Sequence, residues 1–169
     1  MKLKLKVQII VLALIIMSVL VAHATAQTIT PPVQWSDNGH WYQFVSPFSG
    51  WLGARQWAEN HGGYLATIAS AEENAFLVAI LDQVHSSANL GGYEPNNDGN
   101  WVWITGEPWS YTNWIPGQPS NTGGNENYLG LTESAGWGWG GWNDGDSLNI
   151  NALIEYNLPL GFIYVFFQD

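Results

Sequence analysis

The segment from residue 113 to residue 128, NWIPGQPSNTGGNENY, is dense in side chains that can offer oxygen atoms to a bound ion or ligand. Two prolines and three glycines in the same segment favour a long irregular loop over a helix or a strand. The segment is therefore either a site that holds a ligand or a solvated polar loop. The oxygen-bearing side chains at issue are Gln118, Ser120, Asn121, Glu126 and Asn127.

A second segment of interest, AGWGWGGWND at 135–144, interleaves glycines with three tryptophans. Because glycine leaves the backbone exposed, Trp137 or Trp139 could present an indole face beside a ligand. Aromatic faces of this kind stack on the apolar side of a sugar ring. Tryptophan is heavily buried on average, so core packing is the alternative for each of them. Trp137 and Trp139 are therefore candidates to stack on an apolar face of a ligand.

Two helices are predicted in the first half of the chain, as part of the frame for these segments. Residues 50–63 place small and aromatic residues on one face, and a pair of glycines ends the pattern. Residues 70–85 give the stronger helical pattern, because Ser70 and Glu73 have the spacing of an N-terminal capping box. Apolar residues then recur at helical period, at Phe76, Leu77, Ile80, Leu81 and Val84.

Short strands make up the remainder of the predicted framework. One precedes the first helix and one lies between the helices, whereas the chain after His85 shows only Trp- and Tyr-rich strands between Gly/Asn/Pro loops. Residues 27–38, with two adjacent prolines, are interpreted as a leader into the fold. Two helices and a loop-rich sheet predict a single α+β domain. The predicted strands are 40–45, 64–68, 101–104, 127–131 and 151–156.

The two ends of the chain are interpreted separately from this domain, which we place at 27–157. Residues 1–26 combine three lysines, an apolar run of 15 residues and a small-residue cleavage site, a pattern typical of a signal peptide. The run is shorter than the roughly 20 residues that span a membrane. We therefore expect a secreted protein, extracellular or periplasmic, with no membrane attachment after cleavage. The apolar tail at 158–169 is either an extra core strand or the remnant of a longer segment.

Charge and cysteine content exclude several classes of partner. After residue 26 the chain has Arg55 as its one strong cation against 14 acidic residues, a formal charge of −13. Such a chain repels nucleic acid and anionic membrane, and it suits cations or neutral ligands. The sequence contains no cysteine, so disulfides and zinc–cysteine clusters are excluded.

Several segments, taken in order, resemble the C-type lectin-like domain family. They are WLGARQWAENHGGYLATIASAEENAFL, WVWITGEPWSYTNWIPGQPSN, NENYLGL, GWND and ALIEY, and the resemblance covers about residues 36–156. It implies a C-type lectin-like fold, with two helices flanking a small, mostly antiparallel sheet and a long ligand-binding loop region. Most members keep two disulfides, whereas this chain can form none. In that respect it is similar to the cysteine-free bacterial members.

The resemblance also implies a ligand set for calcium. In sugar-binding members, a Glu-Pro-Asn or Gln-Pro-Asp triplet supplies two ligands around a cis proline, and residues 118–120 stand here as Gln-Pro-Ser. A glutamate eight residues after the first position supplies a third ligand, which is Glu126 here. A Trp-Asn-Asp triplet on a late strand, 142–144 here, supplies the others and buries its Trp in the core. The implied ligands are Gln118, Ser120, Glu126, Asn143 and Asp144, of which Ser120 departs from both family patterns.

This set is chemically suited to Ca²⁺, which binds 6–8 oxygen ligands from carboxylates and neutral carbonyls. Sugar hydroxyls could fill the remaining coordination positions. Glu126 and Asp144 could instead form the carboxylate pair of a glycosidase, but they are not available for that role if both bind one cation. The chain has no Gly-x-Ser-x-Gly motif, and His40, His61 and His85 lack the i,i+4 metal spacing. We therefore expect a binding protein and not an enzyme, with these histidines in structural roles.

The sequence thus predicts a secreted, calcium-dependent carbohydrate-binding lectin. Gln118 at the first triplet position is similar to the galactose-type members, so a galactose-type preference is expected over a mannose-type one. A shallow site of this kind binds single sugars weakly, so a homo-oligomer could provide avidity. The competing hypothesis is a protein-interaction module that keeps the fold without binding sugar. The sugar-binding residues are expected to be the five calcium ligands together with Trp137 and Trp139.

Overall fold

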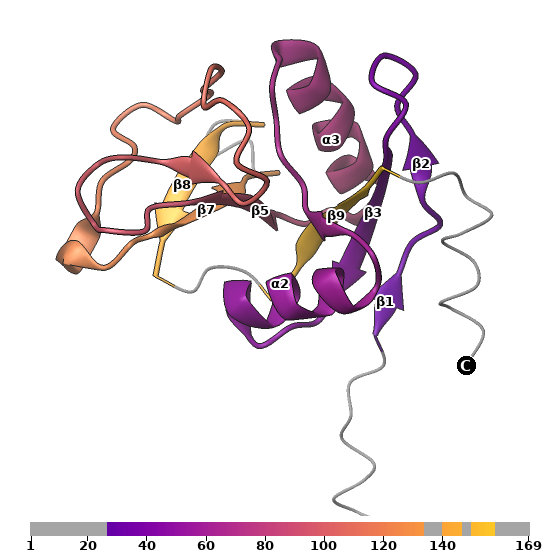
Figure 1. Cartoon of the computed structure of the whole chain (residues 1–169), viewed down its shortest axis with the longest axis horizontal. Helices are drawn as coiled ribbons and strands as arrows, with labels where there is room; N and C mark the ends of the chain where they lie inside the picture. The colour runs from indigo at the N-terminus through magenta and orange to yellow at the C-terminus, as the bar shows by residue number, and fades with distance from the viewer. Residues whose placement is uncertain (1–26, 134–139, 147–149, 158–169) are drawn as a thin grey trace, which may run out of the picture.

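The computed structural model describes residues 27–133, 140–146 and 150–157 of the chain. These residues form two helices, one 3₁₀ turn and a mixed sheet of nine strands, which confirms the predicted α+β class (Figure 1). The predicted signal peptide, the C-terminal tail and both stacking candidates, Trp137 and Trp139, lie outside the described residues. Among the described helices, none is long and apolar enough to cross a membrane.

The sheet is mostly antiparallel and runs in the order β1-β3-β9-β5-β7-β8, with β2 added beside β3, β4 beside β9 and β6 beside β5. Among the named strands of the described residues, β5 and β9 form the one parallel pair. The strands are β1 (Thr28–Ile29), β2 (Val33–Gln34), β3 (Trp41–Ser46), β4 (Tyr64–Leu65), β5 (Ala88–Tyr93), β6 (Val102–Trp103), β7 (Tyr128–Leu131), β8 (Trp142–Gly145) and β9 (Ala152–Tyr156).

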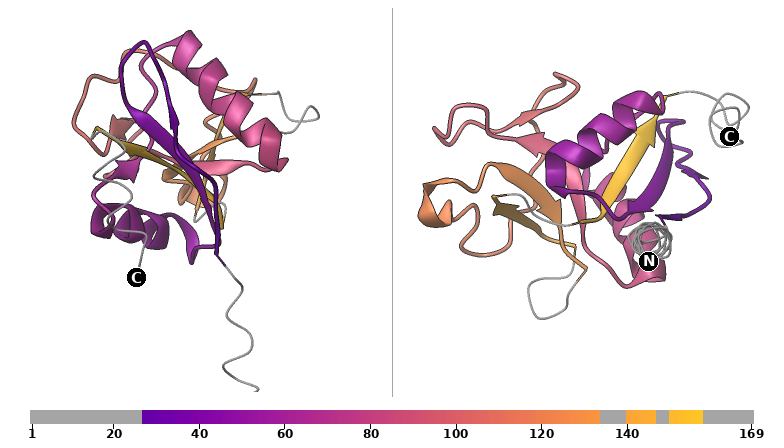
Figure 2. Two further views of the ribbon diagram at one scale, coloured as in Figure 1. Left: turned by 90° about the vertical axis from the view of Figure 1, so that its right-hand side faces the viewer. Right: turned by 90° about the horizontal axis from the view of Figure 1, so that it is seen from below.

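Helices α2 (Gly50–Asn60) and α3 (Ala71–Val84) lie on opposite sides of the β3–β9 part of the sheet (Figures 1 and 2). The side chains of β9 pack against both helices, because successive side chains of a strand point to opposite faces of the sheet. Leu153 packs in the core cluster that contains the apolar face of α3, whereas Ile154 packs in the cluster that contains Trp51 of α2. All five residues of β9 are buried, so this strand is the centre of the domain.

Helix α3 begins where the capping pattern predicts. The Ser70 side chain accepts a hydrogen bond from the backbone N–H of Glu73 at 3.1 Å, which satisfies one of the free donors of the first turn. Among the described residues, the second bond of a capping box, from the Ser70 backbone N–H to the Glu73 carboxylate, is not formed. The Glu73 carboxylate instead accepts from the Ala69 N–H at 2.7 Å and from the Tyr42 hydroxyl at 2.5 Å. Glu73 therefore ties the start of α3 to strand β3.

All five predicted strands are present, but two segments differ from the prediction. Residues 27–38 are not a simple leader, because β1 and β2 lie there and pair with β3 on either side of the two prolines. Proline cannot donate to a strand ladder, which confines such segments to short edge strands. Strand β5 was not predicted, although it lies between β9 and β7 in the sheet.

The glycines of β5 explain both its place and why it was missed. A Cβ on Gly91 would meet the backbone carbonyl oxygen of Leu65 at 2.4 Å, and one on Gly92 would meet the Leu129 side chain at 2.7 Å. Glycine weakens a strand pattern in the sequence, yet here it lets neighbouring backbone approach closely. The tertiary contact, and not local propensity, therefore selects the strand.

A buried polar cluster links β9 to the first strands. Glu155 is 1% exposed and accepts hydrogen bonds from the Thr67 N–H at 3.0 Å and the Tyr64 hydroxyl at 2.9 Å, and His40 Nδ1 lies 2.6 Å from its Oε1. Burial raises the pKa of the Glu155 carboxyl, and the hydrogen bonds from Thr67, His40 and Tyr64 oppose that shift. Burial and the Glu155 charge together raise the pKa of Tyr42 beyond its usual range.

Candidate functional site

The predicted loop is held alongside strand β8 by backbone contacts. Trp114 forms a parallel bridge with Trp142, the Trp142 N–H donates to the Asn113 carbonyl at 2.8 Å, and the Ile115 N–H donates to the Trp142 carbonyl at 3.0 Å. The loop then turns at the Gln118 N–H, which donates to the Ile115 carbonyl at 2.9 Å. These contacts align the start of the loop with the Trp-Asn-Asp triplet.

Asp144 receives the next part of the loop. Its Oδ1 accepts from the backbone N–H of Ser120 at 3.0 Å, and its Oδ2 accepts from the N–H of Asn121 at 2.7 Å. The side chain is almost fully buried, with 1% exposure, because the loop backbone covers it. Both carboxylate oxygens are thus fixed by two adjacent peptide groups. The structure therefore brings Ser120 and Asp144, separated by 24 positions in the sequence, into contact.

Glu126 approaches the same place from the other end of the loop. Its Oε2 accepts from the Ser120 hydroxyl at 2.9 Å and from the Thr122 N–H at 2.5 Å, within the 3₁₀ turn η1 (Thr122–Gly124). Its Oε1 takes part in neither bond. Ser120, the predicted ligand that departs from the family pattern, therefore contacts both predicted acidic ligands, Asp144 through its N–H and Glu126 through its hydroxyl.

The two amide residues of the predicted set also lie at this site. The Gln118–Pro119 peptide bond is cis, as the resemblance predicts, and Gln118 Oε1 is buried without a hydrogen-bond partner among the described residues. The Asn143 amide nitrogen lies 2.6 Å from the Asp144 carbonyl oxygen. The assignment of the two amide atoms of Asn143 follows only from such contacts. Rotating this amide group by 180° exchanges its two atoms. Oδ1, which could bind a cation, would then lie beside that carbonyl.

Together these groups form an arrangement that suits a hard cation. Ser120 joins the two carboxylates, while Gln118 lies two residues before Ser120 on the loop and Asn143 directly precedes Asp144 on β8. Calcium takes mixed carboxylate, amide and hydroxyl oxygens of this kind. Leaving a buried carbonyl oxygen unpartnered costs roughly 1–3 kcal/mol, so the orphaned Oε1 of Gln118 itself favours an ion or a donor beside it. The residues present therefore fit a calcium ion.

The structure adds two residues that the sequence did not single out, Asn97 and Glu94. The Asn121 amide donates to Asn97 Oδ1 at 2.8 Å, and the Asn97 amide donates to the Gly124 carbonyl at 2.7 Å, so a second loop supports the site. Glu94, which is 4% exposed, accepts from the Gly99 N–H in that loop. Asn127 Oδ1, next to Glu126 in the chain, is a second buried oxygen without a partner among the described residues. No local pattern identified Asn97 or Glu94, because their role depends on contact between loops.

Trp142 behaves as the resemblance implies. It is fully buried, and its indole N–H donates to Asn74 Oδ1 of α3 at 2.8 Å. Its ring packs edge-on against Trp103 and Trp114, with centroids 5.7 and 5.8 Å away. This packing fixes the start of β8, and hence the position of Asp144 two residues later.

Comparison with known proteins agrees with this fold. Residues 49–154, more than half of the chain, match the model of the lectin C-type domain family. The chain belongs to this family. Its C-type lectin domain has 34% identity over 134 residues to ladderlectin of Oncorhynchus mykiss, covering 70% of each chain. Perlucin of Haliotis laevigata is 33% identical over 100 residues, which cover 57% of this chain and 63% of perlucin, so the chain spans less than two thirds of perlucin.

A solved structure gives the same result. The carbohydrate-recognition domain of cow CD23, determined in the presence of a GlcNAc2Man3 oligosaccharide, superposes on this C-type lectin domain with a TM-score of 0.65. The two share 25% identity, and the match covers 79% of this chain and 99% of the CD23 chain. The cysteine-free chain therefore keeps the family fold without disulfides.

Proposed function

We propose that this C-type lectin domain binds carbohydrate through one calcium ion held between the loop and strand β8. The ligands would be the five predicted residues, Gln118, Ser120, Glu126, Asn143 and Asp144. When bound, the ion would supply a positive centre that accepts lone pairs from vicinal sugar hydroxyls. The observation that carries the proposal is the orphaned Gln118 Oε1, buried two residues before Ser120, which together with Asn121 donates a backbone N–H to Asp144.

Charge supports the same assignment. Glu126 and Asp144 contribute two negative charges, and the one arginine or lysine after residue 26, Arg55, pairs with Glu59 at 2.8 Å on helix α2. Among the described residues, no strong side-chain cation is therefore available to neutralise the pair. A divalent ion would balance both charges, and the neutral amides would complete the oxygen set.

The chain's own residues would also orient a sugar. Each sugar hydroxyl donates to one ligand oxygen and accepts from a neighbouring amide N–H, so the position of the amide selects the hydroxyl geometry. Gln118 puts an amide at the first triplet position, as in galactose-type members. The Ser120 side chain is shorter than that of Asn or Asp, and its hydroxyl already donates to Glu126 at 2.9 Å, so it would replace them only in part. We therefore propose a galactose-type preference together with weak calcium affinity.

The relatives support a carbohydrate ligand in general terms. The named similarities are to lectins and to a carbohydrate-recognition domain, whose family model covers the loop and β8 of this chain. Secretion, with signal cleavage after residue 26, and homo-oligomerisation for avidity remain part of the proposal. We propose Trp137 and Trp139 as stacking residues beside the ion.

Affinity chromatography tests the proposal. The protein is applied with calcium to immobilised galactose and to immobilised mannose, then eluted with free sugar or with a chelator. We expect retention on galactose and release by either agent. The double substitution Gln118→Glu with Ser120→Asn restores the mannose-type triplet, and it should move retention to mannose.

A matched control separates sugar choice from loss of the fold. Glu59→Gln removes one surface carboxylate from α2, far along the chain from the loop, and should leave both retention profiles unchanged. Retention on mannose alone by the unmodified protein would contradict the galactose preference. Failure to be retained on any sugar, with the fold intact, would favour the protein-interaction module instead.

A further inference from the structure

Three side chains that metals commonly use meet at the C-terminal end of α3. Asp82 lies in the last turn of the helix, His85 is its C-cap residue, and Glu133 follows strand β7. One ligand atom from each lies within 4.8 Å of the other two, and His85 Nδ1 is 3.8 Å from Glu133 Oε1. In the sequence these residues are separated by 3 and 48 positions, so no local motif joins them.

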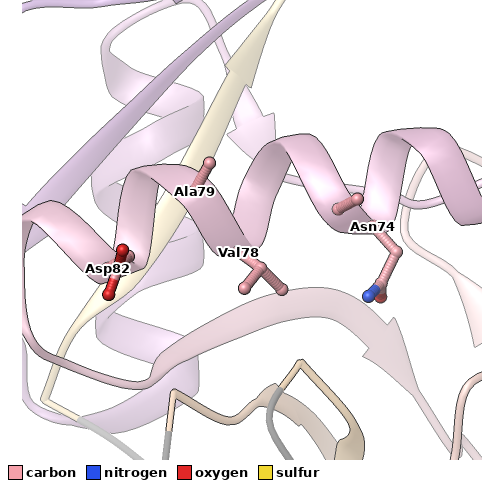
Figure 3. A pocket seen from close by; sticks show the side chains of 5 residues that line it. Asn74, Val78, Ala79 and Asp82 are labelled. Atoms are coloured by element: carbon pink, nitrogen blue, oxygen red, sulfur yellow. The ribbon is translucent and has the colours of Figure 1, made fainter.

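The two segments that carry these side chains are tied together by the backbone. The Glu133 N–H donates to the Ser87 hydroxyl at 3.1 Å, two residues after His85. The backbone of His85 has the left-handed conformation, with φ of 48°, and this ends the helix there. Figure 3 shows Asp82 on the same side of α3 as Asn74 and Val78, where these residues line a pocket of about 400 Å³.

The electrostatics at this position favour a cation. The C-terminal end of a helix carries a partial negative charge, and the last turn of α3 contains no basic residue. Glu133 is 19% exposed, so it is partly withdrawn from water. Arg55, the one strong cation after residue 26, is paired with Glu59. Among the described residues, only the imidazole of His85 is therefore placed to balance Asp82 and Glu133.

We propose that Asp82, His85 and Glu133 form a second divalent-metal site, selective for Zn²⁺-like ions over Ca²⁺. Imidazole nitrogen suits zinc and its transition-metal neighbours, whereas calcium takes oxygen ligands. Two carboxylates and one histidine would leave a fourth tetrahedral position for water.

The present distances are close to those that such an ion requires. Zinc binds oxygen and nitrogen ligands at about 2.0–2.2 Å, which puts tetrahedral ligands about 3.4 Å apart. The 3.8 Å between His85 Nδ1 and Glu133 Oε1 exceeds this by about 0.4 Å, and the other pairs, which lie within 4.8 Å, exceed it by at most about 1.4 Å. The His85 side chain is 82% exposed, so it can close the gap by rotating. A bound ion would link the end of α3 to the segment after β7.

This site is separate from the loop site. Glu126 precedes β7 and Glu133 follows it, and the four residues of β7 alone extend about 13 Å. The two sites share no residue, so their failures are distinguishable. The proposal therefore stands independently of calcium binding and of carbohydrate binding.

The test is a calorimetric titration of the full chain with Zn²⁺ in the presence of about 10 mM calcium. This concentration exceeds the dissociation constants of extracellular calcium modules, about 10⁻⁴–10⁻³ M, so calcium would occupy the loop site. We expect one zinc per chain, and a loss of affinity of at least tenfold in each of His85→Ala and Glu133→Gln. His61→Ala removes another histidine and should bind zinc as the unmodified protein does. Asp144→Asn, which alters the loop site, should also leave zinc binding unchanged.

A second measurement does not depend on the variants folding. On addition of zinc to the unmodified protein, the imidazole NMR signals of His85 should shift, while those of His61 should not. Unshifted His85 signals at saturating zinc would overturn the proposal. So would a zinc affinity in His85→Ala within twofold of the unmodified protein, or loss of zinc binding in Asp144→Asn.

Discussion

The substitution Asp144→Asn probes the loop site with the smallest change of shape. In the unmodified protein both carboxylate oxygens accept a backbone N–H, from Ser120 at 3.0 Å and from Asn121 at 2.7 Å. An asparagine keeps one acceptor, but its amide nitrogen is a donor and faces the other N–H. One charge-assisted hydrogen bond is therefore lost and one donor is left opposed.

The cost can be estimated from these contacts. A hydrogen bond to a charged group contributes roughly 1.5–3 kcal/mol to the free energy of unfolding. Ser120 is exposed, so water replaces part of the lost bond and the lower half of that range applies. For a domain of this size, 1 kcal/mol shifts the melting temperature by about 3–5 °C. The calcium-free variant should therefore melt about 5–10 °C below the unmodified protein.

Calcium gives the experiment its second result. If the dissociation constant is about 10⁻⁴–10⁻³ M, 10 mM calcium should stabilise the unmodified protein by roughly 1.4–2.7 kcal/mol, or about 4–13 °C. Asp144→Asn should lose most of this increment, because a carboxylate ligand becomes a neutral amide. The assay is thermal unfolding followed by circular dichroism, with chelator and with calcium.

A charge-matched control is Glu59→Gln, which removes an exposed carboxylate bonded to Arg55 on α2. Exposed pairs of this kind contribute about 0.3–0.5 kcal/mol, so the melting temperature should change little and the calcium increment should be kept. If Asp144→Asn retains the full increment, or melts with the unmodified protein in chelator, the assignment of Asp144 is refuted.

Three further predictions concern the frame and the binding mode. Burial raises the pKa of Glu155 above its value in the unfolded chain, so the stability that the protonated carboxyl contributes is lost as the pH rises through the folded-state pKa. In urea unfolding, the stability advantage of the unmodified protein over Glu155→Gln should therefore narrow from pH 4 to pH 7. An advantage that widens over this range would contradict the prediction. Gly91→Ala should cost about 1–3 kcal/mol or more in urea unfolding, because its Cβ meets the Leu65 carbonyl oxygen at 2.4 Å. Gly53→Ala, whose Cβ meets only the Ser49 side chain, should not show this cost. Free galactose should bind with about millimolar affinity, and dense galactose arrays far more tightly, as measured by calorimetry and surface binding; nanomolar binding of the free sugar to a monomer would be inconsistent with a shallow site.

The helices and most strands could be predicted because their signals are local. The capping serine and the apolar period of residues 70–85 predicted α3, which spans Ala71–Val84. Strand β5 could not be predicted in the same way, since Gly91 and Gly92 are selected by close approach of neighbouring strands. Strands β1 and β2 are two residues each and depend on pairing with β3.

Some residues of the candidate site could be predicted from the sequence, and others could not. Residues 118–120, Glu126 and residues 142–144 could be named because their order resembles a family pattern, and the structure places Ser120 in contact with Glu126 and Asp144. The supporting residues Asn97 and Glu94 could not, because their contacts depend on how two loops meet. The cluster of Asp82, His85 and Glu133 likewise arises from packing across 48 positions of sequence. Such contacts leave no periodic signal in a single sequence.

The central claim is that calcium between the loop and β8 holds the sugar. The most direct test measures binding of the protein to a dense galactose surface while calcium is removed with a chelator and then restored. We predict that binding is lost on removal and returns on restoration, and that Asp144→Asn fails to bind throughout. Binding that persists unchanged in chelator would contradict it.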